Sequence, residues 1–189
     1  LQNGEVILVD KPLTWSSFQV VNKLKHQIRK KFKLRKFKIG HAGTLDPLAT
    51  GLLIICTGKK TKSIPGYQDK IKEYTGTITV GSTTPSFDLE TEINATFSTS
   101  SITSDDLQKA RDQFLGDILQ TPPVFSAVKI DGKRAYKSAR KGEEVVMRKR
   151  LVNVSEFEIN TENFPKVHFR IVCSKGTYIR SLANDFGAS

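Results

Sequence analysis

The chain is organised around Gly40-His41-Ala42-Gly43-Thr44-Leu45-Asp46-Pro47-Leu48-Ala49-Thr50-Gly51. Its three glycines and its proline predict a backbone that turns tightly and can approach another molecule closely. The stretch contains one carboxylate, Asp46, directly before the proline. We predict that Asp46 is a nucleophile. The alternative is that Asp46 caps a helix that begins at Pro47, because Asp followed by Pro is a common helix start.

Composition limits the possible partners and cofactors. The 189 residues include 30 Lys and Arg against 19 Asp and Glu, which gives a net charge of +11. This excess favours nucleic acid as the partner, with an anionic membrane surface as the second choice. No apolar stretch is nearly as long as the about 20 residues that a membrane-spanning helix needs. Cys56 and Cys173 are expected to be buried, reduced thiols, and the three His lack metal-ligand spacing, so we expect neither metal nor cofactor.

The sequence before the glycine-rich stretch predicts a strand, a helix and a basic block. Residues 6–9 are apolar and end at Asp10-Lys11-Pro12, which is typical of a buried strand that runs into a turn. Lys11 is either a solvated lysine or a contact to phosphate or to the active site. Ser16 or Ser17 is expected to cap a helix. Residues 23–38 contain nine Lys and Arg and no acid, interleaved with Phe and Leu, and are either a solvated face or a nucleic-acid contact.

The next segments predict strands with candidate contacts at their ends. Residues 52–56 are expected to form a strand or a short helix. Gly58-Lys59 does not belong to a P-loop, because the apolar run before it could not present N–H groups to a phosphate. Lys59 and Lys62 remain candidates for binding the RNA backbone. Residues 74–81 alternate as in a half-buried strand. Tyr74, at its start, is either a packing residue or an aromatic that stacks on an unstacked base.

The remaining sequence predicts a helix, a basic protrusion and two strands. A helix is expected from Thr103 to Gly116. Residues 121–150 are basic, with a hairpin turn at Asp131-Gly132 and a short helix over 136–142. Strands are expected over 151–159 and 167–174. A glycine turn then leads into a helix that carries Arg180 in its first turns. Local sequence alone leaves open whether Arg180 is only a surface arginine.

Taken together, these motifs resemble the TruB-type tRNA pseudouridine synthases. The resemblance is carried, in order, by Asp10-Lys11-Pro12, the stretch 40–51, Lys72-Glu73-Tyr74, Pro122-Pro123 with Ser126-Ala127, and Ser174-Lys175-Gly176-Thr177-Tyr178-Ile179-Arg180. It implies an α+β pseudouridine synthase fold with a mixed, largely antiparallel sheet and flanking helices. It also implies one catalytic domain over residues 1–189 with a thumb-like insertion at about 121–149, and an RNA-binding tail domain that is not present in this sequence.

The implied reaction is the conversion of the T-loop uridine (position 55) of tRNA to pseudouridine. Asp46 would attack either the uracil ring or the sugar C1′ of a flipped-out uridine. Arg180 would pair with Asp46, and Tyr74 would lie against the uracil and assist proton removal at C5. His41 would fill the space that the target base leaves. Residues 82–88 depart from the Thr-Asp-Thr-type pattern that is common in the family, because Pro85 stands where its first acid often falls.

The resemblance also implies partners and a location. We expect a cytoplasmic monomer that binds the T-arm of tRNA and no membrane, and we expect Lys11 and Pro12 to support the catalytic loop. The alternatives are an RNA-binding module without catalysis and a polybasic protein of the membrane surface. The expected RNA-binding residues are His41, Lys11, Lys59, Lys62, Lys129, Arg134 and Lys175.

Overall fold

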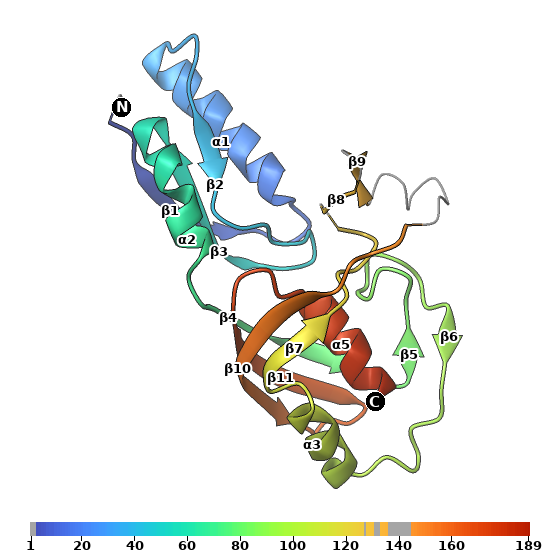
Figure 1. The fold of residues 1–189 in the computed structure, drawn as a ribbon. Helices are drawn as coiled ribbons and strands as arrows, with labels where there is room; N and C mark the ends of the chain where they lie inside the picture. Colours follow the sequence, from blue (N-terminus) through green and yellow to red (C-terminus); the bar gives the residue numbers. More distant parts are fainter. Residues whose placement is uncertain (1–2, 127, 131–132, 136–144) are drawn as a thin grey trace. The chain divides into compact units, whose positions relative to one another are not determined.

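The computed structural model describes residues 3–126, 128–130, 133–135 and 145–189. The chain forms two compact units, residues 1–70 and 71–189. Each unit is built from antiparallel strands and helices, as Figure 1 shows. The predicted α+β class is therefore confirmed. In the described part of the chain, no helix is both long and apolar enough to cross a membrane.

The first unit, unit 1, is a three-stranded antiparallel sheet with one long helix. The strands lie in the order β1 (Val6–Lys11), β3 (Gly51–Thr57) and β2 (Ile39–His41), and the helix is α1 (Ser17–Phe32). A short 3-10 helix, η1 (Gly58–Ser63), and α2 (Ile64–Gln68) follow β3. Residues 52–56 are thus a strand. The segment 6–9 is a strand as predicted, but it is not fully buried, because Leu8 is 67% exposed.

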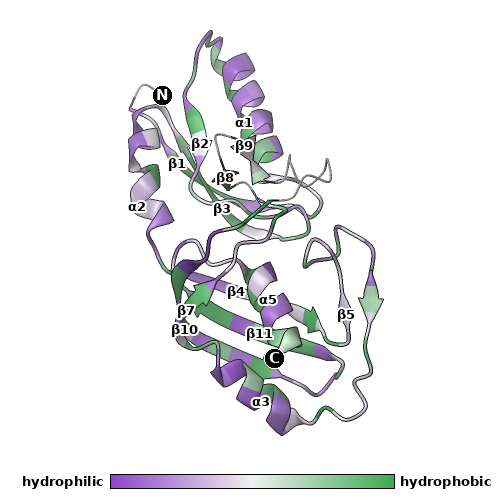
Figure 2. Ribbon diagram, turned by 45° about the vertical axis from the view of Figure 1, so that its right-hand side comes forward, coloured by the Kyte–Doolittle hydropathy of each residue, from purple (hydrophilic) through white to green (hydrophobic). Residues whose placement is uncertain are grey.

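Helix α1 begins where the sequence predicts and packs by its apolar positions. Ser16 is the N-cap, and its side chain and that of Gln19 form a capping box. Val20 and Val21 are buried against Leu53 and Ile55 of β3. The turns beyond this contact are hydrophilic, as Figure 2 shows for the upper part of α1. The helix therefore attaches to the sheet by its first half and carries its basic residues on exposed turns.

The second unit, unit 2, is built on a four-stranded antiparallel sheet. Its strands lie in the order β4 (Lys72–Thr79), β11 (Lys166–Cys173), β10 (Arg150–Asn160) and β7 (Gly116–Gln120). The helices are α3 (Ser104–Asp112) and α5 (Ile179–Ala188). Two small pairs complete the unit, β5 (Ser82–Thr83) with β6 (Ala95–Thr96), and β8 (Lys129–Ile130) with β9 (Lys133–Arg134).

Both helices contribute to one core on this sheet. Val154, Ile171 and Leu182 are each 0% exposed, and Leu107 of α3 joins the same cluster. The rings of Phe157 and Phe186 meet edge to face with centroids 5.6 Å apart. This core holds α5 on the sheet. Because α5 carries Arg180 near its start, the core also helps to place Arg180.

Most of the remaining predictions for unit 2 are confirmed, and one is wrong. The predicted helix over 103–116 ends at Asp112, because Gly116 has a φ of +79° and begins β7, and Leu115 is 37% exposed rather than buried. β8 and β9 pair on either side of Asp131-Gly132, as a hairpin requires. The turn itself and the helix expected over 136–142 lie outside the described residues.

The two cysteines are free and buried, as predicted. Cys56 lies in β3 and Cys173 at the end of β11. Burial raises the pKa of both thiols, so neither is a thiolate at neutral pH.

Truncating a core side chain on the buried face of α5 tests the packing of this helix on the sheet of unit 2. We expect Leu182→Ala to lower the free energy of unfolding by about 2–5 kcal/mol, because the cavity lies under a fully buried helix face. Leu151→Ala is the matched control, since Leu151 is 65% exposed, and it should change stability by less than about 0.5 kcal/mol. Urea denaturation followed by circular dichroism measures both. Equal effects of the two substitutions would contradict the assignment of this core.

Candidate active site

The predicted catalytic loop connects β2 to β3 in unit 1. The ladder of these strands is extended by one bond from the Ala42 N–H to the Ile54 carbonyl, at 2.8 Å. Gly43 and Gly51 then have φ values of +128° and +109°, in the region that favours glycine. The Asp10 carboxylate accepts a bond from the Gly51 N–H at 3.1 Å. These features close the loop over residues 42–50, and we call this segment the catalytic loop.

Asp46 lies half-buried in the middle of the catalytic loop. Its carbonyl accepts a bond from the Ala49 N–H at 3.0 Å, which makes a turn at Pro47 and Leu48. The chain goes from this turn into β3 and not into a helix. The alternative in which Asp46 caps a helix begun by Pro47 is therefore wrong.

Ser17 fixes the backbone directly before Asp46. This residue is 2% exposed at the start of α1. Its Oγ accepts from the Leu45 N–H at 2.9 Å and donates to the Leu45 carbonyl at 3.1 Å. One hydroxyl thus satisfies both backbone groups of the residue that precedes the carboxylate.

Lys11 fixes the backbone directly after Asp46. The side chain is 0% exposed, and Nζ donates to the carbonyls of Pro12 at 2.9 Å, Trp15 at 2.5 Å and Pro47 at 3.3 Å. Burial lowers the pKa of Lys11, and the charge of Asp46 opposes that effect. The buried ammonium fits the expected support of the loop. It does not fit a contact with an RNA phosphate, which needs an ammonium at the surface, so this part of the prediction is corrected.

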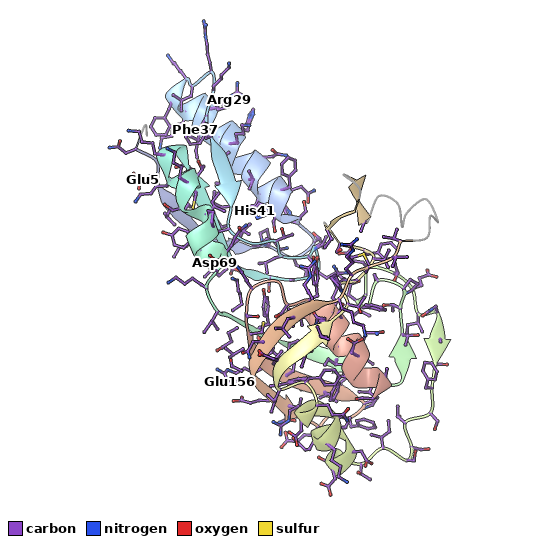
Figure 3. The ribbon with its side chains drawn as sticks, viewed as in Figure 1. Glu5, Arg29, Phe37, His41, Asp69 and Glu156 are labelled. Carbon is purple, nitrogen blue, oxygen red and sulfur yellow. The ribbon has the colours of Figure 1, made fainter. Side chains whose placement is uncertain are left out.

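His41 stands at the entrance to the catalytic loop. It is the last residue of β2 and is half-buried, and Figure 3 shows its side chain on unit 1. Nδ1 donates to the Gly43 carbonyl at 2.5 Å. The ring is therefore oriented by the loop itself.

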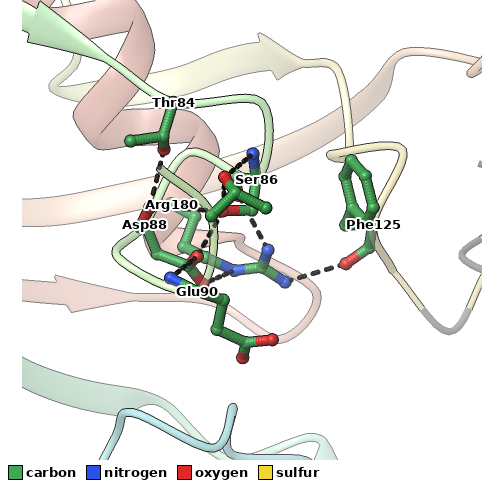
Figure 4. A network of polar contacts seen from close by, with 7 residues as sticks. Thr84, Ser86, Asp88, Glu90, Phe125 and Arg180 are labelled. Carbon is green, nitrogen blue, oxygen red and sulfur yellow. Dashed lines mark hydrogen bonds and ion pairs between the residues drawn. The ribbon is translucent and has the colours of Figure 1, made fainter. Parts of the chain in front are cut away.

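Arg180 lies in unit 2, at the second position of α5. Its guanidinium donates to the Ser86 carbonyl at 2.9 Å and to the Phe125 carbonyl at 3.1 Å, and Nε lies 3.4 Å from Oδ2 of Asp88 (Figure 4). The Arg180 and Asp88 side chains are only 13% and 14% exposed. Arg180 is therefore not a surface arginine, the alternative that local sequence alone leaves open.

Asp88 is a site residue that the sequence analysis did not identify. Its Oδ1 accepts from the Ser86 Oγ at 2.6 Å and from the Glu90 N–H at 2.9 Å, which directs Oδ2 toward Arg180 (Figure 4). The signal was present, since Asp88 ends the stretch in which Pro85 departs from the family pattern. The acid occurs later in the stretch and reaches the arginine through a local turn.

Gln120 was also missed, and it fixes the start of α5. This side chain is 1% exposed. Its amide donates to the Tyr178 carbonyl at 3.0 Å and accepts from the Tyr178 N–H at 2.8 Å. Ser181 Oγ donates to the Thr121 carbonyl at 2.8 Å. The Pro122-Pro123 motif thus begins beside a clamp that sets the helix carrying Arg180.

Tyr74 and the basic candidates lie on different elements. Tyr74 is half-buried in β4, opposite Ile171 of β11, and packs against the unit 2 core. Lys59 and Lys62 are exposed on η1, and Lys175 is exposed after β11. Lys129 and Arg134 are paired across β8 and β9, and their side chains lie outside the description.

Unit 1 provides an aspartate on a fixed loop and an oriented histidine, and unit 2 provides an arginine held by a carboxylate and two carbonyls. Within the described ranges, no three His, Cys, Asp or Glu side chains are grouped as metal ligands. The chemistry available to these residues is nucleophilic attack by a carboxylate and proton transfer.

Comparison with known proteins agrees with these motifs. Residues 29–179 match the family model described as TruB family pseudouridylate synthase (N terminal domain). The tRNA pseudouridine synthase B of Flavobacterium johnsoniae is 60% identical over 185 residues, covering 97% of this chain and 81% of that protein. The enzyme of the same name from Phocaeicola vulgatus is 55% identical over 186 residues, covering 98% and 79%.

Solved structures show the same fold in a larger protein. A chain in the structure entitled "Crystal Structure of a Cbf5-Nop10-Gar1 Complex" has a TM-score of 0.68 at 29% identity, over 99% of this chain and 44% of that chain. A chain in an H/ACA RNP bound to a substrate RNA containing 2′-deoxyuridine has a TM-score of 0.64 at 26% identity, over 99% and 43%. With most of its length matched by the family model and by relatives of high identity, the chain belongs to the TruB family of pseudouridylate synthases.

Proposed function

We propose that the chain converts the T-loop uridine (position 55) of tRNA to pseudouridine, with Asp46 as the nucleophile on a flipped-out uridine. The observation that carries the proposal is the catalytic loop, in which Lys11 and Ser17 fix the backbone on either side of a half-buried carboxylate. The names of the relatives support tRNA as the substrate. The basic composition supports a polyanionic partner.

The reaction is an isomerisation and needs no oxidant or reductant. The bond between N1 of uracil and C1′ breaks, a bond between C5 and C1′ forms, and the proton on C5 is lost while N1 gains one. Asp46 forms a temporary covalent bond, either with the uracil ring or with C1′, and is released as a carboxylate when the base is rejoined. Tyr74 lies against the uracil and assists removal of the C5 proton.

The proposed role of Arg180 is to favour the ionised form of Asp46 and to direct it, as the ordered motifs imply. A guanidinium can do this only if its own orientation is fixed. The two carbonyls and the Asp88 carboxylate supply that orientation within unit 2. Asp88 is thus a positioning residue, because its contacts are to Arg180 and to its own loop.

RNA binding is proposed for His41 and for the exposed lysines. His41 would occupy the gap that the flipped base leaves, which offsets part of the few kcal/mol of lost stacking and pairing. Lys59, Lys62, Lys129, Arg134 and Lys175 would neutralise phosphates and make binding dependent on salt. Lys11 supports the catalytic loop instead, since its ammonium is buried.

Replacing the nucleophile tests the proposal directly. We expect Asp46→Asn to lower pseudouridine formation in a T-arm hairpin by roughly three orders of magnitude or more, with RNA affinity little changed. Chemical detection of pseudouridine and filter binding measure the two quantities. Unchanged product with Asp46→Asn would exclude Asp46 as nucleophile. RNA binding without product in the wild type would favour an RNA-binding module that is not catalytic.

Removing the charge that holds Arg180 should affect turnover more than binding. We expect Asp88→Asn to lower kcat about 10- to 100-fold, because Arg180 loses the ion pair with Asp88 that helps to orient it, and to change tRNA affinity less than about threefold. Glu92→Gln is the matched control, since it makes the same charge change at an exposed position nearby. An equal fall in kcat and affinity with Asp88→Asn would assign Asp88 to RNA binding.

Removing the buried ammonium should loosen the catalytic loop. We expect Lys11→Met to lower the free energy of unfolding by about 1–3 kcal/mol, because the Trp15 carbonyl loses its short bond while Pro12 and Pro47 keep backbone donors. Pseudouridine formation should fall as well. Lys23→Met is the control for stability, since Lys23 is exposed on α1.

The stability difference between the wild type and Lys11→Met should depend on pH, and the lowered pKa of Lys11 sets the direction of that dependence. Burial lowers the pKa of Lys11 in the folded state below the ordinary 10.5, so in the window between the two values the unfolded chain binds more protons. Wild-type stability therefore gains from rising pH across that window, and Lys11→Met lacks this gain. The difference in unfolding free energy between the two proteins should grow with pH below 10.5. A flat difference would contradict the buried charge.

A further inference from the structure

A second candidate site lies in unit 1, away from the catalytic loop. It is a pocket of about 360 Å³ between residues 34–38, which follow α1, and η1. Four lysines line it together with two apolar side chains, and no acid does: Lys36, Lys38, Lys59, Lys62, Leu34 and Phe37. The volume falls within the roughly 300–1,000 Å³ of typical ligand sites.

Backbone contacts hold both walls of this pocket in place. The Lys38 carbonyl accepts from the Gly58 N–H at 2.9 Å, which joins the two walls at their base. Leu34 is held at the end of α1, because its N–H donates to the Arg29 carbonyl at 3.0 Å and its carbonyl accepts from Arg29 Nε at 3.2 Å. The pocket is therefore formed by ordered backbone and not only by long side chains.

The lining combines the two groups that bind single-stranded nucleic acid. Phe37 is half-buried and lines the pocket, and an aromatic face can stack on any base. All four lysines are exposed and supply cations for phosphate. The basic run continues along the last turn of α1 through Arg29, Lys30 and Lys31, which suits a continuing polyanionic strand better than a free nucleotide.

The pocket is too far from Asp46 to receive the target base. β2 and β3 form a hairpin with the catalytic loop at one end, and the pocket begins at the other end, where Gly58 follows β3. The seven residues of β3 span about 20 Å at roughly 3.3 Å per residue. Figure 3 shows Phe37 and His41 separated along this hairpin.

We propose that this pocket binds a nucleotide of the tRNA substrate other than the target uridine. The base stacks on Phe37, and the adjoining phosphates bind Lys36 and Lys38. The identity of the RNA rests on the proposed function. The pocket thereby contributes affinity at a second point of the same substrate.

Binding of an unmodified tRNA transcript at several salt concentrations tests the assignment. We expect Phe37→Leu to weaken binding about fivefold or more without changing the slope of log affinity against log salt, because stacking carries no charge. Phe37→Tyr should bind as the wild type does. Lys36→Gln/Lys38→Gln should reduce that slope by about 1.5 to 2 units, since two phosphate contacts are lost.

Matched controls separate the pocket from general effects. Phe97→Leu removes a ring that is 63% exposed in unit 2, and Lys109→Gln/Lys166→Gln removes two exposed charges there, and neither should reproduce the pocket effects. Circular dichroism confirms folding of each variant, and the double lysine variant carries the test if Phe37→Leu does not fold.

Three results would overturn the proposal. One is wild-type affinity in folded Phe37→Leu, another is an equal loss in Phe37→Tyr, and the third is binding of polyglutamate with the same dependence on Phe37. Binding does not require turnover, so the outcome is distinct from that of the proposed function. A wild type that makes no pseudouridine but binds tRNA through Phe37 would refute the reaction and support the pocket.

Discussion

The buried ammonium of Lys11 is the interaction on which the catalytic loop most depends. It lies at the end of β1 and binds carbonyls of two separate segments, residues 12–15 and Pro47. A hydrocarbon side chain could fill the same space but would leave the Trp15 carbonyl without this bond. Burial lowers the pKa of Lys11, and the charge of Asp46 offsets part of this effect. The loop can thus be irregular in structure and still hold its carboxylate in a fixed position.

Unit 2 uses the same principle at Arg180. Here a buried amide, Gln120, binds both backbone groups of Tyr178 and sets the start of α5, while Asp88 and two carbonyls orient the guanidinium. In both units, a buried polar side chain bonds to the backbone one or two residues away from a predicted site residue. Such contacts cost desolvation unless they are fully bonded, which restricts each position to few residue types.

Periodicity predicted the regular elements because their burial follows the pattern of the sheet and helix. The strands β4, β10 and β11 and the helix α1 are found where alternation and capping place them. The end of α3 was misplaced because Phe114 and Leu115 continue the apolar pattern, although the backbone has already turned toward Gly116. The positive φ of Gly116, where β7 begins, accounts for that boundary, and the spacing of apolar residues does not indicate it.

Some site residues could be predicted from sequence motifs, and others could be found only from the fold. Asp46 and Arg180 stand in ordered motifs, so resemblance could propose them. Asp88 and Phe125, which bind Arg180, lie far from it in the sequence, and only the fold brings them together. The bonds of Lys11 to the loop backbone fit the predicted support, but its complete burial does not fit the predicted phosphate contact. The sequence of a lysine after a strand does not indicate that burial. Sequence motifs therefore indicate the candidate reacting groups, but they do not indicate the residues that hold those groups in place.

The β2–β3 hairpin also has a consequence for the choice of RNA. It carries the catalytic loop at one end and the lysine-lined pocket at the other, and the seven residues of β3 span about 20 Å between them. A folded tRNA presents two nucleotides at a set distance, whereas a flexible strand must lose conformational entropy to reach both. Under the proposal that both points bind RNA, this spacing therefore favours a structured RNA over an unstructured one of the same local sequence.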